Sequence, residues 1–505
     1  MRIDCIRLQE RTDYLFTFRS MASVERLGVD VIINDIDNNP ACTHGPTVLF
    51  ERYQSNGRSR QYYACSACRD RKDCSFFHWA DEKFSKTKRD LWDTLIKDSQ
   101  PKDTEVELCS LNEVLSVLPS ERIYCATCSI LLTSARRGKH KACTLITPLT
   151  DRQLTQPSSF LPPRESAKKE AQYLFASSSV DVIISMLEKI QAKRVLCVGA
   201  PRIYEAITNS EKLNMSALML DIDERFQSFF KHQSFLQYNM FNHYFFDGKK
   251  AKDTYQNFIA GKEKLVLVSD PPFGGRMELL AHNMKRIEQD WRTARHLDPQ
   301  EQLPVLFIFP YFMEPQVLHN LSDFVMLDYQ IDYDNHPLYS SGPKSMKNGS
   351  AVRVYVNQPA SLFSFPESEG YHYCKPCNRW VFNNNKHCEK CKGCMSKDGR
   401  TYRHCDQCKK CVKPSWLHCT ECFRCQPQDH KCKSQGVNGS SKITCHICGG
   451  SDHKRTDCPK KKKRGESFSS EHEGKKKKRR KQNLPSNLTE ERERNLDILS
   501  QIISS

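Results

Sequence analysis

The chain has 505 residues, enough for roughly two to four domains. Its 77 basic and 60 acidic side chains leave a net charge of +17, which favours an anionic partner, with nucleic acid as the first expectation. The 25 cysteines fall largely in Cys-x2-Cys and His-Cys-x2-Cys spacings, which indicate zinc and a reducing compartment rather than disulfides. No apolar run reaches the roughly 18 residues of a membrane span, and no signal-peptide pattern opens the chain. We therefore expect a soluble, intracellular protein with no membrane partner.

The first zinc-binding module is predicted at residues 41–85, after a stretch (1–40) without clear signal in which Met21 is an alternative start. Four side chains make a tetrahedral ligand set, and Cys68 is a spare thiol that is an alternative to Cys65. The set is Cys42, His44, Cys65 and Cys74. The closing Cys-x-Phe-Phe-x-Trp resembles the GRF-type zinc finger, although His44 stands where that family usually has cysteine. The resemblance implies nucleic-acid binding.

Basic and aromatic side chains alternate within this module, a composition suited to single-stranded nucleic acid. The alternative is that the aromatic residues form the small core of the module. The residues concerned are Arg58, Arg60, Arg69, Arg71, Lys72, Tyr62, Tyr63, Phe76 and Phe77.

A second zinc finger, of C2HC type, is predicted at residues 120–145. Its ligands would be Cys125, Cys128, His140 and Cys143. One Cys-x2-Cys and one His-x2-Cys can meet by chance, so this pattern is less specific than the first. The following residues, 144–165, are rich in Thr, Ser and Pro and are predicted to be a linker.

Residues 166–366 alternate apolar strands with helical stretches, which predicts an α/β fold with a doubly wound, mostly parallel, Rossmann-like sheet. The first helix is expected within Ser179–Ile190. The strands are expected at Arg194–Val198, Ala217–Leu220, within 235–246, Leu265–Val268 and Pro304–Pro310.

The ends of the first two strands suit a nucleotide-like cofactor. Gly199 follows the first strand, where a turn without a side chain lets the backbone approach a ligand. Asp221 or Asp223, after the second strand, is placed to accept hydrogen bonds from ribose hydroxyls. The glycine signal is weak because the usual Gly-x-Gly is absent, and a nicotinamide enzyme is the rival on this evidence alone.

The fourth strand ends in Asp270-Pro271-Pro272-Phe273, a set of groups suited to an adenine amine. The Asp270 carboxylate and the Pro271 carbonyl are acceptors for the two N–H donors, and Phe273 offers a ring on which a base can stack. Holding both hydrogens orients the nitrogen lone pair for group transfer. The motif resembles the (Asp/Asn)-Pro-Pro-(Phe/Tyr/Trp) signature of amino-group methyltransferases that use S-adenosylmethionine. The alternative is a purely structural role, in which the motif is a strand end followed by a Pro-Pro turn.

That resemblance implies further cofactor contacts. The run Gln172, Tyr173, Leu174 and Phe175 looks like a Gln-aromatic segment that touches S-adenosylmethionine in one subgroup, although helix core is the alternative for Tyr173 and Phe175. By the same resemblance, Asn239 and Met240 would lie beside the cofactor adenine, Arg202 would reach the methionine carboxylate, and Asp270 would also border the cofactor. The Asp- and Tyr-rich stretch 327–339 either shapes the acceptor pocket or completes a β-meander.

Residues 371–435 form a Cys/His ladder that predicts four interleaved zinc sites and folding only with metal. The sets are Cys374, Cys377, His387 and Cys394; Cys388, Cys391, His404 and Cys411; Cys405, Cys408, His418 and Cys425; and Cys419, Cys422, His430 and Cys432. The ladder resembles the cysteine-rich domain of DHHC palmitoyltransferases. Acyl transfer is not expected, because the Asp-His pair of that family is replaced by Trp416-Leu417.

Residues 443–460 match the CCHC zinc knuckle, which grips unpaired bases of RNA or single-stranded DNA. Its ligands are Cys445, Cys448, His453 and Cys458. The tail, 461–505, is basic and is predicted to be largely disordered. Its lysine runs suit phosphate binding or a nuclear or nucleolar signal, with a merely solvated charge run as the alternative.

Together these modules resemble the zinc finger CCHC domain-containing protein 4 family over nearly the whole chain. The resemblance implies N6-methylation of an adenosine in large-subunit (28S) ribosomal RNA with S-adenosylmethionine and Zn²⁺, in the nucleus or nucleolus and the cytoplasm. Ribosome-assembly or RNA-processing proteins are further expected partners. Two alternatives stay open, a protein lysine methyltransferase and a non-catalytic zinc-rich RNA-binding scaffold.

Overall fold

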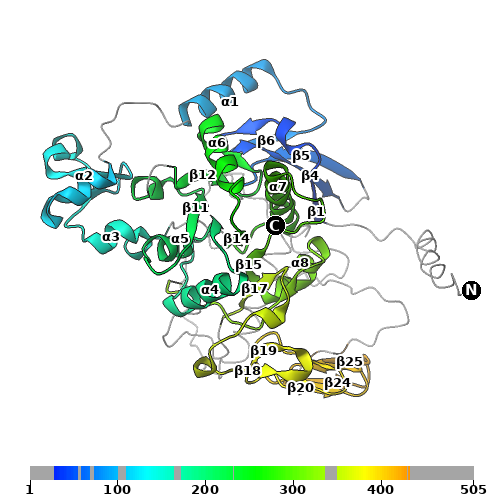
Figure 1. The fold of residues 1–505 in the computed structure, drawn as a ribbon. Coiled ribbons are helices and arrows are strands. Elements are labelled where there is room, and N and C mark those ends of the chain that lie inside the picture. Colours follow the sequence, from blue (N-terminus) through cyan, green and yellow to red (C-terminus); the bar gives the residue numbers. More distant parts are fainter. Residues whose placement is uncertain are drawn as a thin grey trace, which may run out of the picture. The chain divides into compact units, whose positions relative to one another are not determined.

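The computed structural model describes residues 28–54, 58–68, 73–99, 110–163, 172–230, 233–335, 350–428, 430 and 432. The chain, whose fold is drawn in Figure 1, divides by its internal contacts into two compact units, residues 1–402 and 403–505. Met21, the predicted CCHC knuckle and the basic tail lie outside the described residues. Within the described ranges, every helix is too short or too polar to cross a lipid bilayer.

The first unit is centred on an eight-stranded sheet in the order β13-β12-β11-β10-β14-β15-β17-β16. Five neighbouring strands are parallel: β12 (Phe235–Asn239), β11 (Ser216–Asp221), β10 (Arg194–Val198), β14 (Leu265–Ser269) and β15 (Val305–Pro310). Three strands pair antiparallel: β13 (Tyr244–Phe245), β17 (Val352–Val356) and β16 (Val325–Met326). The predicted strands and the mostly parallel α/β fold are confirmed. The sheet continues on both sides of β10, so β10 and β14 flank the point where the strand order reverses, which is where open α/β sheets bind ligands.

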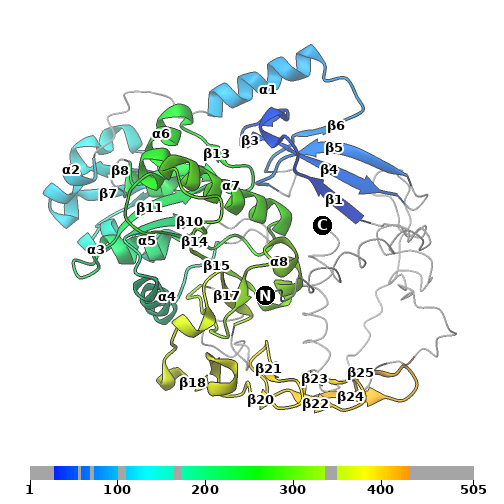
Figure 2. The ribbon, with the colours of Figure 1, turned by 45° about the vertical axis from the view of Figure 1, so that its right-hand side comes forward.

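Helices cover both faces of this sheet (Figure 2). On one face α4 (Ser177–Ile190) packs against α5 (Pro201–Thr208). On the other, α7 (Met277–Arg295) lies between α6 (Gly248–Ile259) and α8 (Glu314–Asn320). The central strands β10 and β14 are apolar except for Arg194 at the start of one and Ser269 at the end of the other, because both of their faces are buried.

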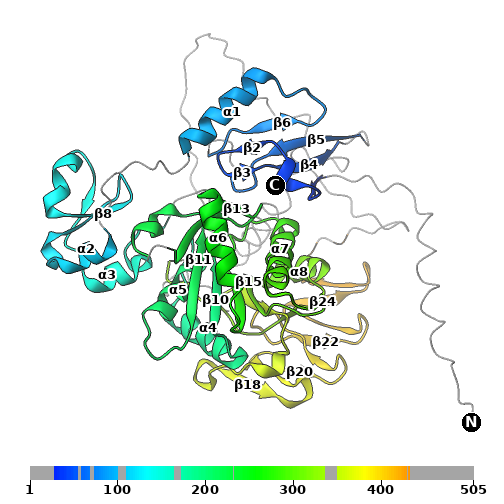
Figure 3. The same cartoon turned by 45° about the horizontal axis from the view of Figure 1, so that its top comes forward.

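The GRF-type module contains a four-stranded sheet and a helix (Figure 3). Its strands are β1 (Gly28–Ile32), β4 (Val48–Tyr53), β5 (Ser59–Ala64) and β6 (Phe77–Trp79), with a hairpin of β2 (Ala41–Cys42) and β3 (Gly45–Pro46) and the helix α1 (Lys86–Ser99). The module extends beyond residues 41–85, because β1 pairs with β4 and Trp92 of α1 is buried against Phe76. Five residues of β1 carry too little pattern to be recognised alone.

The second zinc finger is a three-stranded sheet of β7 (Arg122–Cys125), β8 (Ile130–Thr133) and β9 (Leu145–Ile146), preceded by α2 (Leu111–Ser116). The linker predicted at 144–165 was wrong. This stretch contains β9 and α3 (Asp151–Thr155), and it buries Leu149, Leu154 and Leu161 in the main core. These three widely spaced leucines anchor the stretch to the core. The composition of the stretch is dominated by Thr, Ser and Pro, so it predicted a linker instead.

The Cys/His ladder is a series of short hairpins. The first unit holds β18 (Tyr371–Cys374) with β19 (Arg379–Phe382), and β20 (His387–Cys388) with β21 (Gly393–Cys394). The second unit holds β22 (Arg403–Cys405) with β23 (Lys410–Val412), and β24 (Trp416–Cys419) with β25 (Arg424–Pro427). The ladder begins as part of the core of the first unit, because the buried Asp328 carboxylate accepts 2.8 Å hydrogen bonds from the Phe382 amide and the Asn385 side chain.

Candidate active site and zinc centres

A cavity of about 560 Å³ opens at the carboxyl ends of the parallel strands. Most of the predicted site residues line it: Gln172, Tyr173, Gly199, Asp221, Asp223, Asn239, Met240, Asp270, Pro271, Pro272 and Phe273. Leu174, Phe175 and Arg202 are not among its lining residues. The sequence motifs at the ends of β10, β11, β12 and β14 therefore meet in one place.

Gly199 and Asp270 meet where the strand order reverses. The Asp270 amide donates to the Val198 carbonyl at 3.0 Å, which continues the β10–β14 pairing into the turn. Gly199 has a φ of 70°, and a Cβ on it would lie 2.7 Å from the Asp270 carbonyl oxygen and 2.9 Å from Cε of Met240. Only glycine permits both this conformation and this close approach.

Asp270 borders the cavity and is partly accessible from it, while protein atoms surround most of its carboxyl group. This enclosure raises the pKa of Asp270 well above the ordinary carboxyl range. A hydrogen bond from the Tyr333 hydroxyl to Oδ1, at 3.2 Å, opposes the rise, and the negative charge of Asp221 adds to it. Burial thus has the largest effect on the pKa of Asp270, and two neighbours from distant parts of the chain act on it in opposite directions.

Aromatic rings close one side of the cavity. Tyr173 stacks on Phe273 with ring centroids 5.5 Å apart and an interplanar angle of 29°. The helix-core alternative is wrong for Tyr173 and Phe175, because both precede α4. Phe175 nevertheless packs in the main core, where its backbone bridges to Tyr333. One face of Phe273 is therefore covered by Tyr173.

The two acids after β11 differ in their partners. The Asp223 carboxylate forms an ion pair with Arg225 at 2.6 Å and accepts from the Gln172 side chain at 3.2 Å. Asp221 accepts a 2.9 Å hydrogen bond from the Asp223 amide. Both line the cavity, so the contact with ribose stays a prediction for either residue.

Arg202 has other partners than the predicted methionine carboxylate. Its guanidinium donates to the Phe175 carbonyl at 2.8 Å and forms an ion pair with Asp334. These bonds join α5 to the segment before α4, and the cofactor contact of Arg202 stays a prediction.

The GRF-type finger forms a wall of the same cavity, through Thr43, His44, Ala67, Cys68 and Asp73. Two asparagines hold it there. Nδ2 of Asn239 donates to the His44 carbonyl at 2.9 Å and to the Ser66 hydroxyl at 3.1 Å. Nδ2 of Asn242 donates to the carbonyls of His44 at 3.1 Å and of Pro46 at 2.7 Å.

The sequence did not predict the contact of Asn242 with the finger, and for Asn239 it predicted only a contact with the cofactor. An isolated asparagine after a strand carries no signal for a partner almost two hundred residues earlier. The prediction for Asn239 and Met240 identified the right loop but not its contact with the finger. The place of Asn239 beside the cofactor adenine stays a prediction.

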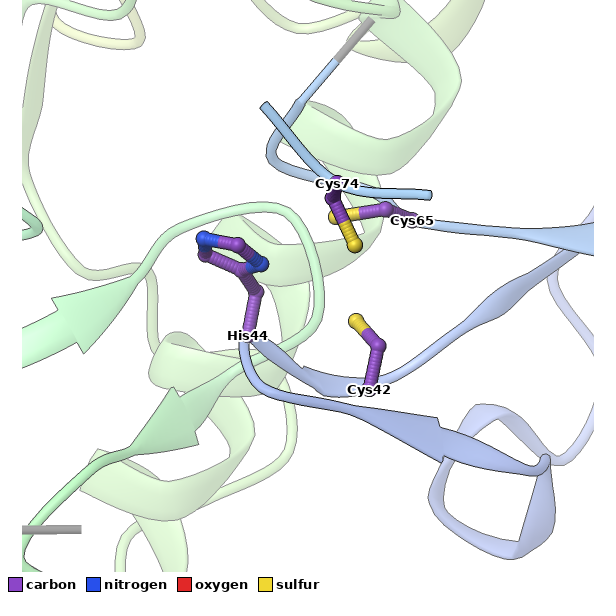
Figure 4. Close-up of side chains that lie close together, drawn as sticks. All are labelled: Cys42, His44, Cys65 and Cys74. Atoms are coloured by element: carbon purple, nitrogen blue, oxygen red, sulfur yellow. The ribbon is translucent and has the colours of Figure 1, made fainter. Parts of the chain in front are cut away.

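The ligands of the GRF-type finger point toward one another (Figure 4). The ligand atoms of Cys42, His44, Cys65 and Cys74 all lie within 4.8 Å of one another, and three thiols with one imidazole suit tetrahedral zinc. Cys68 is also near. Its amide donates to the Cys65 sulfur at 3.4 Å, and its own sulfur lies 3.6 Å from Nε2 of His44. The four-residue set includes Cys65, as the main prediction had it.

The other predicted sets that the structure describes are also brought together. Within 4.8 Å lie the ligand atoms of Cys125, Cys128, His140 and Cys143, of Cys374, Cys377, His387 and Cys394, and of Cys405, Cys408, His418 and Cys425. In the fourth predicted set of the ladder, Sγ of Cys419 lies 3.6 Å from Sγ of Cys432, and Sγ of Cys422 lies 3.7 Å from Nε2 of His430. The set Cys388, Cys391, His404 and Cys411 draws on both sides of Tyr402 and stays a prediction, as does the CCHC set.

Known proteins resemble this chain along most of its length. Residues 166–357 match the family described as "Probable N6-adenine methyltransferase", and residues 40–83 match the GRF zinc finger. The Homo sapiens protein named rRNA N(6)-adenosine-methyltransferase ZCCHC4 is 42% identical over 429 residues, 83% of this chain and 82% of that protein. Its namesake from Xenopus tropicalis is 41% identical over 442 residues, 86% of this chain and 89% of that one. The Mus musculus protein of the same name is 42% identical over 442 residues, which are 86% of this chain and 85% of the mouse protein. The chain therefore belongs to the rRNA N(6)-adenosine-methyltransferase ZCCHC4 family.

Proposed function

We propose that this protein transfers a methyl group from S-adenosylmethionine to N6 of an adenosine in large-subunit (28S) ribosomal RNA, with its zinc modules positioning the RNA. The observation that carries the proposal is the Asp270-Pro271-Pro272-Phe273 turn, which lines a cavity beside Gly199 at the reversal of the strand order. The names of the relatives supply the substrate class.

The cofactor half of the cavity has groups that fit S-adenosylmethionine. Gly199 borders the cavity with backbone that carries no side chain, and the carboxylates of Asp221 and Asp223 suit ribose hydroxyls. Gln172 and Tyr173 border the same space. When bound, S-adenosylmethionine supplies a methyl group on a positively charged sulfur, and the acids that line the cavity favour that charge.

The acceptor half has groups that fit an adenine amine. The Asp270 carboxylate and the Pro271 carbonyl accept its two hydrogens, which fixes the direction of the nitrogen lone pair. Because Tyr173 covers one face of the Phe273 ring, the adenine base would contact either the opposite face or the edge of that ring. A base that is paired or stacked in the RNA must first leave its stack to enter this pocket.

Positioning is the main contribution of the protein to the transfer. The N6 lone pair forms the bond to the methyl carbon, the carbon–sulfur bond breaks with its electrons staying on sulfur, and the extra N6 proton leaves afterward through Asp270 or water. An adenine amine is a weak base, so the reaction requires no strong general base before attack. The ionised Asp270 accepts the amine hydrogen more strongly than the neutral acid, and only the ionised form can take up the proton released from N6, so its raised pKa predicts loss of activity on the acid side.

The GRF-type finger offers a surface suited to RNA. Phe50, Tyr62, Phe77 and Trp79 form a chain of ring contacts across one face of its sheet, and the Arg60 guanidinium lies 3.9 Å from the Trp79 ring centroid. All four rings are partly accessible, whereas Phe76 belongs to the small core. Half-exposed aromatic rings beside exposed arginines such as Arg52 and Arg58 suit stacking on unpaired bases.

The remaining assignments rest on sequence. Zinc fits the Cys₃His sets, and the lysine-rich tail suits a protein of the nucleus and nucleolus that also occurs in the cytoplasm. Ribosome-assembly or RNA-processing proteins are the expected protein partners of an enzyme that modifies ribosomal RNA.

The test is to incubate purified protein with S-adenosylmethionine labelled on its methyl group and with total RNA and protein from cells that lack this enzyme. We expect label in large-subunit ribosomal RNA, recovered as N6-methyladenosine after digestion and mass spectrometry. Label in lysine of a protein would instead support a lysine methyltransferase. No cofactor binding by calorimetry would support a non-catalytic scaffold.

A further inference from the structure

A tyrosine outside every recognised motif reaches the predicted catalytic acid. Tyr333 lies in the Asp- and Tyr-rich stretch after β16, and its side chain is only 1% exposed. Its hydroxyl donates to Oδ1 of Asp270 at 3.2 Å. Its ring also packs near the two rings of the cavity wall, 5.9 Å from Tyr173 and 6.0 Å from Phe273 between centroids.

The backbone around Tyr333 is held on both sides. The Asp334 amide donates to the Leu174 carbonyl at 2.9 Å, and the Asp332 carbonyl accepts from the Ala176 amide at 2.8 Å. The Asn335 side chain accepts from the Leu174 amide and donates to the Gln172 carbonyl, both at 2.8 Å. The segment that bears Tyr333 is therefore fixed to the segment that bears Gln172 and Tyr173, which line the cofactor half of the cavity.

In this arrangement one oxygen of the Asp270 carboxylate, Oδ1, is occupied by the hydrogen bond from the Tyr333 hydroxyl. A carboxylate that rotates freely presents either oxygen in any direction, whereas one that accepts from a fixed hydroxyl presents its second oxygen in one direction. The Asp270 backbone is already fixed by its bond to Val198. Backbone and side chain of Asp270 are thus both restrained before substrate binds.

The same bond affects the charge of Asp270. The groups that act on it are the Tyr333 hydroxyl and the carboxylate of Asp221. Burial and Asp221 favour the neutral acid, whose protonated oxygen is a poorer acceptor than a carboxylate oxygen and therefore holds a second donor less well. Tyr333 is the group that opposes both effects.

We propose that Tyr333 is a positioning residue for methyl transfer, whose hydroxyl orients the Asp270 carboxylate so that its other oxygen accepts from the adenine amine. The inference deepens the proposed function and rests on it. It adds a residue that comes from the far end of the domain and that acts through Asp270 rather than on the methyl group.

The experiment compares Tyr333→Phe with Tyr329→Phe. The control residue lies in the same stretch, is also 1% exposed, and also donates to a carboxylate, that of Glu369 at 3.0 Å, which unlike the Asp270 carboxylate does not line the cavity. Each change removes one hydroxyl and keeps the ring. Cofactor affinity is measured by calorimetry, thermal stability by melting, and methyl transfer to ribosomal RNA by single turnover from pH 5 to pH 9.

We expect Tyr333→Phe to lower the single-turnover rate at pH 7.5 at least about tenfold, as the loss of a hydrogen bond to a charged group predicts, with cofactor affinity unchanged. Without the phenol the pKa of Asp270 rises further, so the acid limb of the rate profile moves to higher pH. Tyr329→Phe should keep the wild-type rate and profile, although both variants lose some thermal stability.

Two results would overturn the inference. A wild-type rate and pH profile in Tyr333→Phe would show that the hydroxyl does not matter. Equal rate losses in both variants, with no shift of the acid limb, would show a structural role only. If wild-type protein in the same assay forms no N6-methyladenosine, the proposed function fails and the inference fails with it, a pattern distinct from failure of the variant alone.

Discussion

The two zinc fingers of the first unit have similar ligand sets but different relations to the active site. Each brings three cysteines and one histidine within 4.8 Å. The GRF-type finger contributes part of the cavity wall, and its His44 carbonyl accepts from both Asn239 and Asn242. Among the described residues 110–163, none lines the cavity.

The C2HC finger is instead joined to the core of the domain. The Ser129 carbonyl accepts from the Ser228 hydroxyl at 2.9 Å, and the Tyr124 ring packs 5.2 Å from that of Phe229. The buried Glu205 carboxylate holds the following segment by accepting from the amide and the hydroxyl of Ser158. The comparison predicts that zinc in the GRF-type finger would organise the cavity wall, whereas zinc in the C2HC finger would support the fold.

The largest difference is expected between His44→Ala and His140→Ala. Each should remove about one zinc per chain, a loss that in isolated fingers is worth about 10–16 kcal/mol of metal-coupled folding. Only His44→Ala should weaken S-adenosylmethionine binding at least about tenfold, about 1.4 kcal/mol, because its loop forms the wall of the cavity. Metal analysis and calorimetry measure the two effects. Equal cofactor affinity in the two variants would break the comparison.

Phe229→Ala tests the anchoring of the second finger. Phe229 is 2% exposed and packs against Tyr124 and Phe160, so its truncation should cost about 3–5 kcal/mol of unfolding free energy. Urea denaturation measures the loss. Cofactor affinity, measured where the variant is folded, should stay near the wild-type value; a tenfold decrease would mean that this finger also shapes the cavity.

Asn242→Ala separates docking of the first finger from its metal. It removes two hydrogen bonds and leaves the carbonyl of Pro46 without that donor, which predicts a loss of about 1–3 kcal/mol in docking and a weaker cofactor complex with zinc retained. Asn209→Ala is the control, because Asn209 donates to the Thr155 carbonyl at 2.8 Å and neither residue lines the cavity. Similar cofactor affinity in both variants would argue that docking is held by other contacts.

The smallest effect concerns pH. Burial raises the pKa of Glu205 to about 7, against 4.5 for an ordinary glutamate. The folded state therefore binds more protons than the unfolded state between these values, and its stability should fall as pH rises from 4.5 to 7. Urea midpoints at pH 5 and pH 8 should differ less in Glu205→Gln than in wild type. An unchanged difference would exclude Glu205 as the source.

Sequence patterns predicted the parts of this protein whose residues are close in the chain. The strands, the Asp-Pro-Pro-Phe turn and the Cys₃His sets each depend on local spacing, and the structure brings them together as expected. Contacts between distant segments were not predictable. Asn242 meets Pro46, and Tyr333 meets Asp270, through single polar atoms that impose no periodicity on their surroundings.

The central claim is that the Asp270 carboxylate positions the adenine amine for methylation. The most direct measurement is single-turnover methyl transfer to ribosomal RNA by wild-type protein and by Asp270→Ala, with zinc content, melting temperature and cofactor affinity determined for both. We predict a rate loss of at least about hundredfold with zinc content unchanged, since misplacement of reacting groups has effects of this size. A variant that keeps zinc, binds cofactor and still forms N6-methyladenosine at a substantial fraction of the wild-type rate would contradict the account.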